Sequence, residues 1–321
     1  MHRRQFHCLL MAPLAAAPLQ AFAQMDRSVI RMLVGFAPGG TADSVARAIS
    51  QSMSKVLNRT VIVENRPGAG GRSVLSELKR SRPDGMTVLL TPSTPLTLAP
   101  WVYLDKLGYD PMRDFTRIAG VARMDFGIMS SPRFPQITDL QSMVAYVKAN
   151  PSQAAYASSG AGTVPHFLGL MIAKKLGVHL EHIPYRGSGP ALGDFVAGQF
   201  PILVDTLWVD RHKAGQLKVL AVTGKTRYRD LPEVPTLKEL GVDIEVDQYF
   251  AIIGPTGMDP AVVEKISAAA RTALASREVQ DALYAIGQEP AWLNASDVTT
   301  LQLAHYKAWE RPVKESGYEP E

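Results

Sequence analysis

The stretch "GFAPGGTAD", residues 35–43, decides the fold because it joins a strand pattern to a helix pattern through nearly bare backbone. An apolar run at 30–36 leads into a Pro-Gly-Gly triplet at 38–40. From Thr41 onward, apolar residues recur on one face at helical spacing. Glycine permits positive φ angles and leaves its N–H group unshielded. The stretch therefore predicts a strand–loop–helix junction with room for a small guest.

The same alternation of short apolar runs and helical segments continues along the chain. Each run is bounded by Gly, Pro, Asn or Ser, which is typical of a buried strand. The predicted strands are residues 30–36, 60–65, 87–91, 154–159, 201–205 and 218–224. Because helical segments lie between them, the sequence predicts an α/β fold with parallel sheets.

The strand–helix units fall into two series, which predicts two domains. Extended stretches at 117–131 and 243–255 are predicted to connect the domains. The first leads from domain 1 into domain 2 and the second leads back, which is a hinge architecture. The C-terminal helical segments are predicted to return to the first domain. We expect domain 1 at residues 24–122 and 250–321, and domain 2, including the hinge strands, at 123–249.

The N-terminus has the pattern of an export signal. A basic start with Arg3 and Arg4 precedes an apolar run at 8–20 that is too short to span a bilayer, and Ala21-Phe22-Ala23 has the form of a cleavage site. Residues 1–23 are therefore predicted to be a signal peptide, and the mature protein to be periplasmic after cleavage near Ala23. The arginine pair leaves both general and twin-arginine export open.

Composition and charge exclude several classes of function. The 321 residues are 46% hydrophobic and 20% charged, as in a soluble globular protein. Cleavage removes two arginines and no acidic residue, so the formal net charge falls from +4 to +2 and gives no basis for nucleic-acid binding. Cleavage also removes Cys8, the only cysteine, which excludes disulfides and cysteine zinc sites. We expect a monomer with no cofactor and no metal.

A second bare loop, "ASSGAGTVPH" at 157–166, also joins a strand pattern to a helix pattern. In parallel α/β sheets, ligands bind beyond the carboxyl ends of strands, where helix N-termini present free N–H groups and a positive dipole. Two facing loops of this kind hold an anion without a lysine or arginine. Phosphate-binding fingerprints are absent, so a carboxylate is favoured. The alternative is that each glycine-rich loop only makes its turn.

Several blocks carry a family resemblance, among them "FAPGGTADSVAR", "VIVENRPGAGG", "YASSGAGTVPHFLG" and "GKTRYRDLPEVPTLKELG". In their content and order, the chain resembles the Bug-type periplasmic solute-binding receptors, the TctC-like component of tripartite tricarboxylate transporters. The resemblance implies a two-domain, type II venus-flytrap periplasmic-binding-protein fold. Each domain is then a mostly parallel sheet flanked by helices, joined to its neighbour by two crossing strands, and two loops grip a ligand carboxylate.

The resemblance also implies ligand-binding residues. The first grip comprises Phe36, Ala37, Gly39, Gly40, Thr41 and Asp43, and the second Ser158, Ser159, Gly160, Gly162, Thr163 and His166. Thr91, Ser93, Tyr185 and Asp205 are further candidates at the cleft. Asp43 stands at a helix start, which favours a capping role over ligand contact. His166 is either a rim contact or a structural histidine.

The ligand class stays open between a dicarboxylate, a tricarboxylate, an amino acid and an aromatic acid. Asp205 could hold a ligand ammonium group or bond a loop amide. Phe167 and Trp208 add bulk where the family is commonly smaller or less aromatic. The expected partners are membrane transporter subunits, and the alternative is a periplasmic sensor that presents its closed form to a signalling protein.

Catalysis is the competing class of function. Ser159, His166 and Asp205 have the residue types of a hydrolase triad, but the nucleophile elbow needs glycine at position 157, where Ala157 stands. His179 and His182 have no clustered partner with which to bind zinc. We therefore expect that the protein is not an enzyme.

Overall fold

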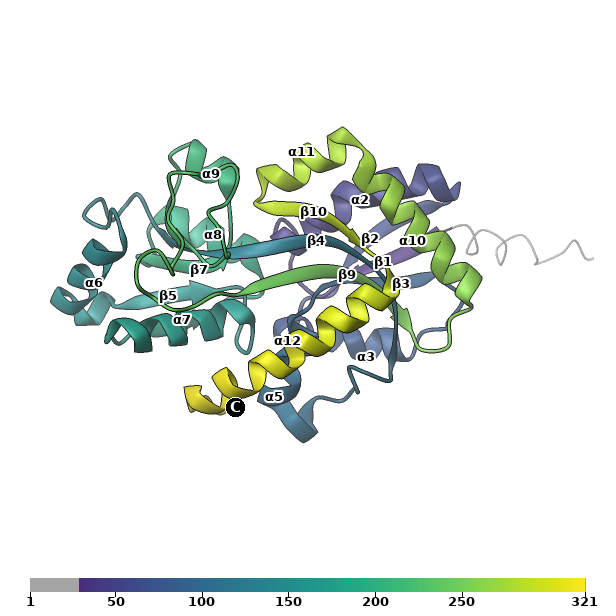
Figure 1. The fold of residues 1–321 in the computed structure, drawn as a ribbon, viewed down its shortest axis with the longest axis horizontal. Helices are drawn as coiled ribbons and strands as arrows, with labels where there is room; N and C mark the ends of the chain where they lie inside the picture. Colours follow the sequence, from purple (N-terminus) through teal and green to yellow (C-terminus); the bar gives the residue numbers. More distant parts are fainter. Residues whose placement is uncertain (1–28, 321) are drawn as a thin grey trace, which may run out of the picture.

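The computed structural model describes residues 29–320, so the predicted signal peptide and its cleavage site lie outside the described residues. Two α/β lobes lie side by side and share two long strands (Figure 1). Among residues 29–320, no helix combines the length and apolarity that a bilayer crossing needs.

The first lobe is built on three parallel strands with β1 in the middle, because β1 pairs with both β2 and β3. These strands are β1 (Val29–Val34), β2 (Thr60–Asn65) and β3 (Thr87–Pro92). The helices of this lobe are α2 (Thr41–Leu57), α3 (Ser73–Lys79), α4 (Thr94–Thr97), α5 (Ala99–Tyr103), α10 (Pro260–Ala275) and α11 (Arg277–Ala285).

The second lobe repeats this plan with β5 in the middle, parallel to β6 and β7. Its strands are β5 (Ala155–Ser158), β6 (Glu181–Pro184), β7 (Ile202–Thr206) and β8 (Lys218–Val222). Its helices are α6 (Leu140–Ala149), α7 (Val164–Leu176), α8 (Ser188–Ala197) and α9 (Val209–Lys213).

Two antiparallel strands, β4 (Phe115–Ser130) and β9 (Asp247–Pro255), connect the lobes. β4 pairs with β9 and β10 (Gln288–Leu293) over its first part, and with β7 and β8 from Phe126 onward. The main strand order is β2-β1-β3-β9-β4-β7-β5-β6. The predicted α/β fold with two crossing strands is confirmed. The sheet is mixed, because each parallel set meets an antiparallel crossing strand.

Helix α2 shows why the predicted pattern folds as it does. Its residues Val45, Ala46, Ile49 and Met53 are buried, as the helical spacing predicts, and this face packs toward β1 and α10. The helix ends at Asn58 in the left-handed conformation, a common C-terminal signal. The strand before α2 and this buried face together fix where its N-terminus points.

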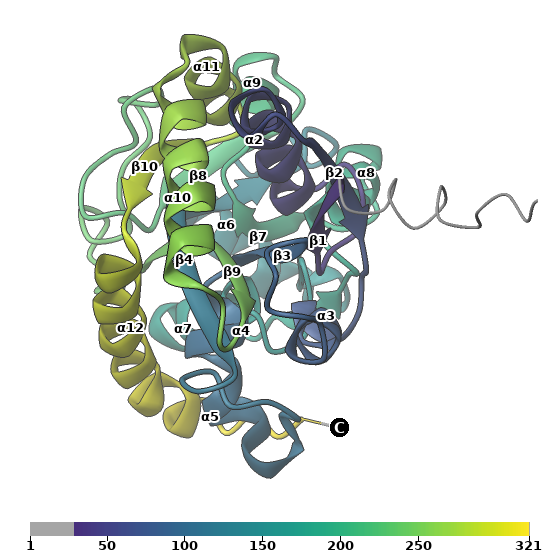
Figure 2. The same ribbon diagram turned by 90° about the vertical axis from the view of Figure 1, so that its right-hand side faces the viewer.

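The C-terminal helix α12 (Ala295–Ser316) contacts both lobes. It runs along α4 and α5 and then reaches α7, where the Trp309 ring lies 6.4 Å from the Phe167 ring. Helices α10, α11 and α12 lie along the same side of the molecule (Figure 2). The lobes are therefore joined by this helix as well as by the two crossing strands.

Candidate functional site

Three helix N-termini meet where the lobes face each other. The loop after β1 leads into α2 through Gly40, and the loop after β5 leads into α7 through Thr163, so the two predicted loops are brought together. The third is α8, which begins at Ser188 after β6. The first N–H groups of each helix have no partner within it, so the three N-termini can donate to an anion.

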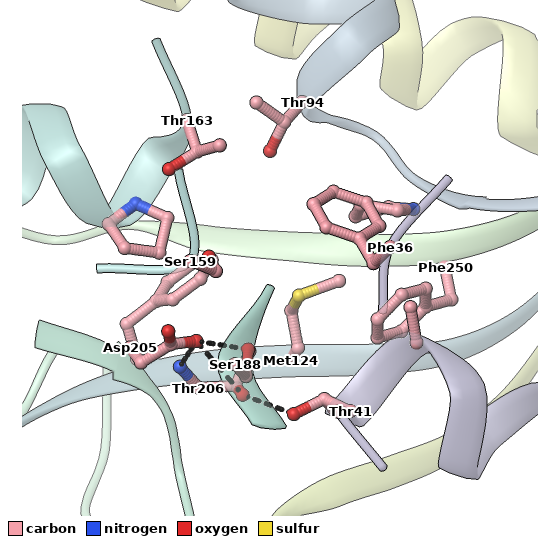
Figure 3. Close-up of a pocket in the computed structure, with 15 residues that line it drawn as sticks. Phe36, Thr41, Thr94, Met124, Ser159, Thr163, Ser188, Asp205, Thr206 and Phe250 are labelled. Carbon is pink, nitrogen blue, oxygen red and sulfur yellow. Dashed lines mark hydrogen bonds between the residues drawn. The ribbon is translucent and has the colours of Figure 1, made fainter. Parts of the chain in front are cut away.

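The cleft between these loops has about 440 Å³ of unfilled space, a figure that includes solvent at its mouth. Side chains from both crossing strands, Met124, Phe126 and Phe250, line it together with the loop residues (Figure 3). The lining residues are Phe36, Gly40, Thr41, Ala42, Pro92, Thr94, Met124, Phe126, Ser159, Thr163, Pro165, Ser188, Asp205, Thr206 and Phe250. No lysine, arginine or histidine belongs to this set of described residues.

The two lobes touch across the cleft. Thr41 Oγ1 in the first lobe lies 2.6 Å from Thr206 Oγ1 in the second, and the Ala37 N–H donates to the Arg186 carbonyl oxygen at 3.1 Å. Gly40 and Gly189 approach so closely that a Cβ on Gly40 would lie 3.1 Å from the Gly189 nitrogen. The structure is therefore a closed arrangement of the lobes.

Asp43 braces the first loop from behind. Its carboxylate accepts hydrogen bonds from the Gly39 N–H, the Arg47 guanidinium and the Asn65 side-chain amide, each at 3.0 Å. Burial opposes ionisation of Asp43, but these bonds together with the Arg47 charge outweigh it and hold its pKa below the ordinary value. The carboxylate therefore faces the loop and does not line the cleft, while the N-cap position of α2 is Gly40.

The second loop is held by its own hydrogen bonds. The Gly162 N–H donates to His166 Nδ1 at 3.1 Å, and the Thr163 hydroxyl donates to the Gly160 carbonyl oxygen at 2.7 Å. The Gly160 N–H donates to Ser158 Oγ at 3.3 Å. These bonds leave Ser159 and Thr163 lining the cleft, while Ser158, Gly162 and His166 shape the loop from outside it.

His166 and His182 form a stacked pair beneath this loop, with ring centroids 3.9 Å apart. The Ser158 hydroxyl lies 2.7 Å from His182 Nε2. Burial lowers the pKa of His166 to about 4, and burial together with the neighbouring ring lowers that of His182 to about 3. Both rings are therefore neutral at pH 7, and His166 supports the loop as a structural histidine.

Asp205, at the end of β7, is the one ionisable side chain in the cleft lining of the described chain. It is 1% exposed, and burial raises its pKa to about 6. Its Oδ1 accepts from Ser188 Oγ at 2.8 Å, from the Thr206 N–H at 2.7 Å and from Thr206 Oγ1 at 3.4 Å. Its Oδ2 has no hydrogen-bond partner. Ser159 lies close enough to favour the ionised form, but outside hydrogen-bond geometry with Oδ2.

Comparison with known proteins gives this arrangement a family. The model of the tripartite tricarboxylate transporter family receptor matches residues 45–318. The chain belongs to this receptor family. A UPF0065 protein from Cupriavidus necator is 34% identical over 88% of this chain and 86% of its own length.

Solved structures agree with this membership. The periplasmic binding protein BugD superposes with a TM-score of 0.86 at 31% identity, covering 91% of this chain and 99% of BugD. MatC from Rhodopseudomonas palustris, solved with bound malate, superposes with a TM-score of 0.81 at 28% identity, covering 89% of this chain and 98% of MatC. A second R. palustris protein, solved with adipate, superposes with a TM-score of 0.85 at 27% identity, covering 91% of this chain and 98% of the R. palustris chain. The venus-flytrap fold is thereby confirmed, and the family is one of solute-binding receptors.

Some of the receptor's predicted site residues lie away from the cleft lining. Thr91 Oγ1 donates to the Pro92 carbonyl oxygen at 2.9 Å, and the Ser93 hydroxyl donates to Gln248. Their neighbours Pro92 and Thr94 line the cleft in their place. Tyr185 donates its hydroxyl to Asp194 Oδ2 at 2.7 Å, so its polar end is used within the second lobe.

A second hollow adjoins the cleft and shares Phe36 and Ser159 with it. Gly160, Tyr185 and the short turn η2 (Ala69–Gly71) also line it. Two cations border this hollow: the Arg72 guanidinium, 3.2 Å over the Tyr103 ring, and the exposed Arg186. Positive charge thus lies beside the cleft, but not within its lining.

Sequence reasoning missed the third helix start and the strand residues. Ser188 is the last residue of the glycine-containing segment "YRGS" (185–188), which lies between a strand and an apolar helix, the same pattern that marked the other two loops. Met124 and Phe126 are two residues apart on β4 and both line the cleft, as period-2 spacing on a crossing strand allows. Thr206, at the end of β7, and Phe250, in the crossing strand β9, also line the cleft.

The residues that resembled a hydrolase triad are not assembled as one. His166 accepts from the Gly162 N–H and stacks on His182, and within residues 29–320 no hydrogen bond joins it to Ser159 or Asp205. No group of three or more His, Cys, Asp or Glu in this part of the chain could hold a metal ion.

Proposed function

We propose that this receptor captures a small carboxylate between its two lobes in the periplasm and delivers it to membrane subunits of a tripartite tricarboxylate-type transporter. The mature chain then begins at Gln24, after signal cleavage behind Ala23. The observation that carries the proposal is the meeting of three helix N-termini in a cleft whose lining contains no cationic side chain.

Backbone N–H groups suit a carboxylate because they are fixed donors with no charge to neutralise. Each charge-assisted hydrogen bond contributes about 1.5–3 kcal/mol. The Ser159 hydroxyl lines the cleft beside these helix starts and adds a further donor. The Thr163 hydroxyl already donates to the Gly160 carbonyl oxygen, and the Thr41 hydroxyl is paired with that of Thr206. The malate and adipate complexes of the two R. palustris relatives support the same class of ligand.

The residues fall into two roles in this proposal. Ligand contact falls to Phe36, Gly40, Thr41, Ser159, Thr163, Ser188, Asp205 and Thr206. Loop shape depends on Ala37, Gly39, Asp43, Ser158, Gly160, Gly162 and His166. Thr91, Ser93 and Tyr185 act through the strands and helices behind the cleft.

Domain closure follows from where the binding groups lie. α2 belongs to the first lobe, and α7 and α8 to the second, so a ligand that bridges them binds the closed form better than the open one and drives the motion. We infer two domains, at 24–122 with 250–321 and at 123–249, in a monomer that carries out no catalysis.

A thermal-shift screen of the purified mature chain tests the proposal. The panel contains dicarboxylates, citrate, amino acids and aromatic acids, each beside its neutral amide as a matched control. An acid at about 100 times its dissociation constant adds about 2.7 kcal/mol of stability, whereas its amide adds none. If no acid raises the melting temperature, or if acid and amide act equally, carboxylate capture is refuted.

A further inference from the structure

The cleft holds an unused acceptor oxygen, Asp205 Oδ2. The Asp205 side chain is 1% exposed, and its other oxygen takes three hydrogen bonds from Ser188 and Thr206. Oδ2 has none, although it belongs to a residue that lines the cleft (Figure 3). Buried polar atoms are nearly always hydrogen-bonded, so Oδ2 is an acceptor left open in this closed form of the described chain.

Among residues 29–320, no lysine, arginine or histidine lines the cleft to pair with Asp205. The side chains that share the lining are hydroxyls, aromatic rings, prolines, an alanine and a methionine. Arg72 and Arg186 border the neighbouring hollow instead of the cleft. A buried carboxylate without a counter-charge is costly, and the cost is removed by a cationic donor on a bound molecule.

The cleft therefore presents groups of opposite polarity next to each other. The N-termini of α2, α7 and α8 present positive dipole ends and N–H donors, and Asp205 presents a negative oxygen. A molecule that carries an ammonium group next to its carboxylate can pair with Asp205 Oδ2 and with the N–H groups at the same time. A diacid of the same length leaves Oδ2 unpaired beside a second anion or a methylene group.

We propose that the ligand is an amino acid, whose ammonium group donates to Asp205 Oδ2 while its carboxylate meets the helix starts. This assignment rests on the carboxylate capture proposed above and narrows it to ligands with an amino group. Ser188 and Thr206 are positioning residues here, because their hydrogen bonds to Oδ1 turn Oδ2 toward the cleft. Asp205 is the residue that determines specificity.

Calorimetric titration of the mature protein at pH 8 tests this with pairs of ligands that differ only in the amino group. The pairs are aspartate and succinate, glutamate and glutarate, and phenylalanine and 3-phenylpropionate. In the pair that fits the cleft, the amino acid binds at least about tenfold more tightly, the effect of one charge-assisted hydrogen bond.

Variants assign the preference to one side chain. Asp205→Asn keeps the shape and removes the charge, so amino-acid affinity falls at least about tenfold and the gap within the pair narrows. Asp210→Asn removes an exposed carboxylate five residues along the chain and leaves both affinities unchanged. If Asp205→Asn does not fold, titration of the unmodified protein with the ligand pairs still tests the proposal.

Two failures are distinguishable. If succinate, glutarate or 3-phenylpropionate binds as tightly as its amino partner or more tightly, the amino-acid assignment is overturned, because Oδ2 then carries its own proton and donates to a ligand carboxylate. The same holds if Asp205→Asn keeps the full preference for the amino partner. If no acid of any pair binds, carboxylate capture itself is wrong, and the assignment is lost with it.

Discussion

Single side chains fix the shape of the cleft loops by accepting hydrogen bonds from backbone N–H groups that do not face the cleft. Asp43 takes the Gly39 N–H, and His166 takes the Gly162 N–H. What remains for a guest is the first turn of each helix, where the hydroxyls of Thr41 and Thr163 also stand. The selectivity of the cleft for a ligand therefore depends on which backbone N–H groups remain without a partner in the protein.

Replacing Asp43 by alanine removes this brace. The Gly39 N–H and the Asn65 amide lose their shared acceptor, so the free energy of unfolding falls by about 2 kcal/mol and ligand affinity falls with it. Urea denaturation and calorimetric titration measure the two effects. Asp210→Ala, at an exposed aspartate, serves as the control. Equal stability of the Asp43 variant and the control would rule out the bracing role.

The stacked histidines predict a sensitivity to acid. Their folded pKa values, about 4 for His166 and about 3 for His182, lie below the ordinary value of 6.5. As the pH falls below 6.5, the unfolded chain takes up protons first, so the stability that the neutral rings contribute is present above pH 6.5 and is lost progressively as the pH falls to about 4 for His166 and about 3 for His182.

A comparison with His182→Gln isolates this effect, because glutamine can still bond Ser158 but does not titrate. The raised pKa of Asp205, about 6, acts in the opposite direction and cancels in the difference between the two proteins. We expect the stability advantage of the unmodified protein in urea to shrink from pH 7.5 to pH 4.5. A constant difference would show that His182 does not titrate as described.

The residue types at the cleft could be predicted from sequence, but their hydrogen bonds could not. Thr41 and Asp43 form a local helix-start pattern, but that pattern does not show that Asp43 accepts from the Gly39 N–H ahead of the helix. The role of His166 depends on His182 and Tyr318, which fold against it from distant parts of the chain. No local pattern carries that information.

Closure of the two lobes depends on a close approach between the N-termini of α2 and α8, at which glycine residues lie. A Cβ on Gly189, in the first turn of α8, would lie 2.9–3.0 Å from backbone atoms of Pro38, Gly39 and Gly40 before α2. Backbone at that distance must move apart. Glycine at this position therefore lets the lobes come as close as they do.

Gly189→Ala tests this contact without altering a side chain in the cleft lining. Overpacking costs about 1–3 kcal/mol, so ligand affinity is expected to fall roughly tenfold while the fold is kept. Gly193→Ala in the same helix is the matched control, since its new Cβ would meet no atom within 4 Å. Calorimetric titration of both variants with the ligand that gives the largest shift in the screen measures this difference. Equal ligand affinity of the two variants would contradict a role of the Gly189 contact in closure.

Most elements could be predicted, because short apolar runs and helical periods are local patterns. The six predicted strands correspond to β1, β2, β3, β5, β7 and β8. β10 was missed because its run "QEPAWL" is short, contains Pro290 and pairs only with the edge of β4. The start of α8 was not assigned to the cleft, because nothing local shows that it faces α2.

The whole molecule is joined at its outer side by α12 as well as by the crossing strands. Trp309, which is 4% exposed, belongs to the same buried cluster as Phe167 of α7, while the N-terminal part of the helix packs on the first lobe. The two-lobed plan could be predicted from the repeated strand–helix series. The reach of α12 into the second lobe could not, because a helical pattern does not say which lobe its apolar face meets.

Trp309→Ala removes the anchor of this helix on the second lobe. Loss of a buried tryptophan costs about 3–5 kcal/mol, which urea denaturation measures directly. Leu303→Ala on the same helix is the control, since Leu303 is 43% exposed and its loss changes stability by no more than about 0.5 kcal/mol. Similar losses in both variants would contradict the anchoring role.

The most direct test of the account is a crystal structure of the receptor with the acid that gives the largest thermal shift. We predict a closed form in which a ligand carboxylate accepts hydrogen bonds from backbone N–H groups at the starts of α2 and of α7 or α8. A carboxylate held instead by Arg72 and Arg186 in the adjoining hollow, or bound to one lobe only, would contradict it.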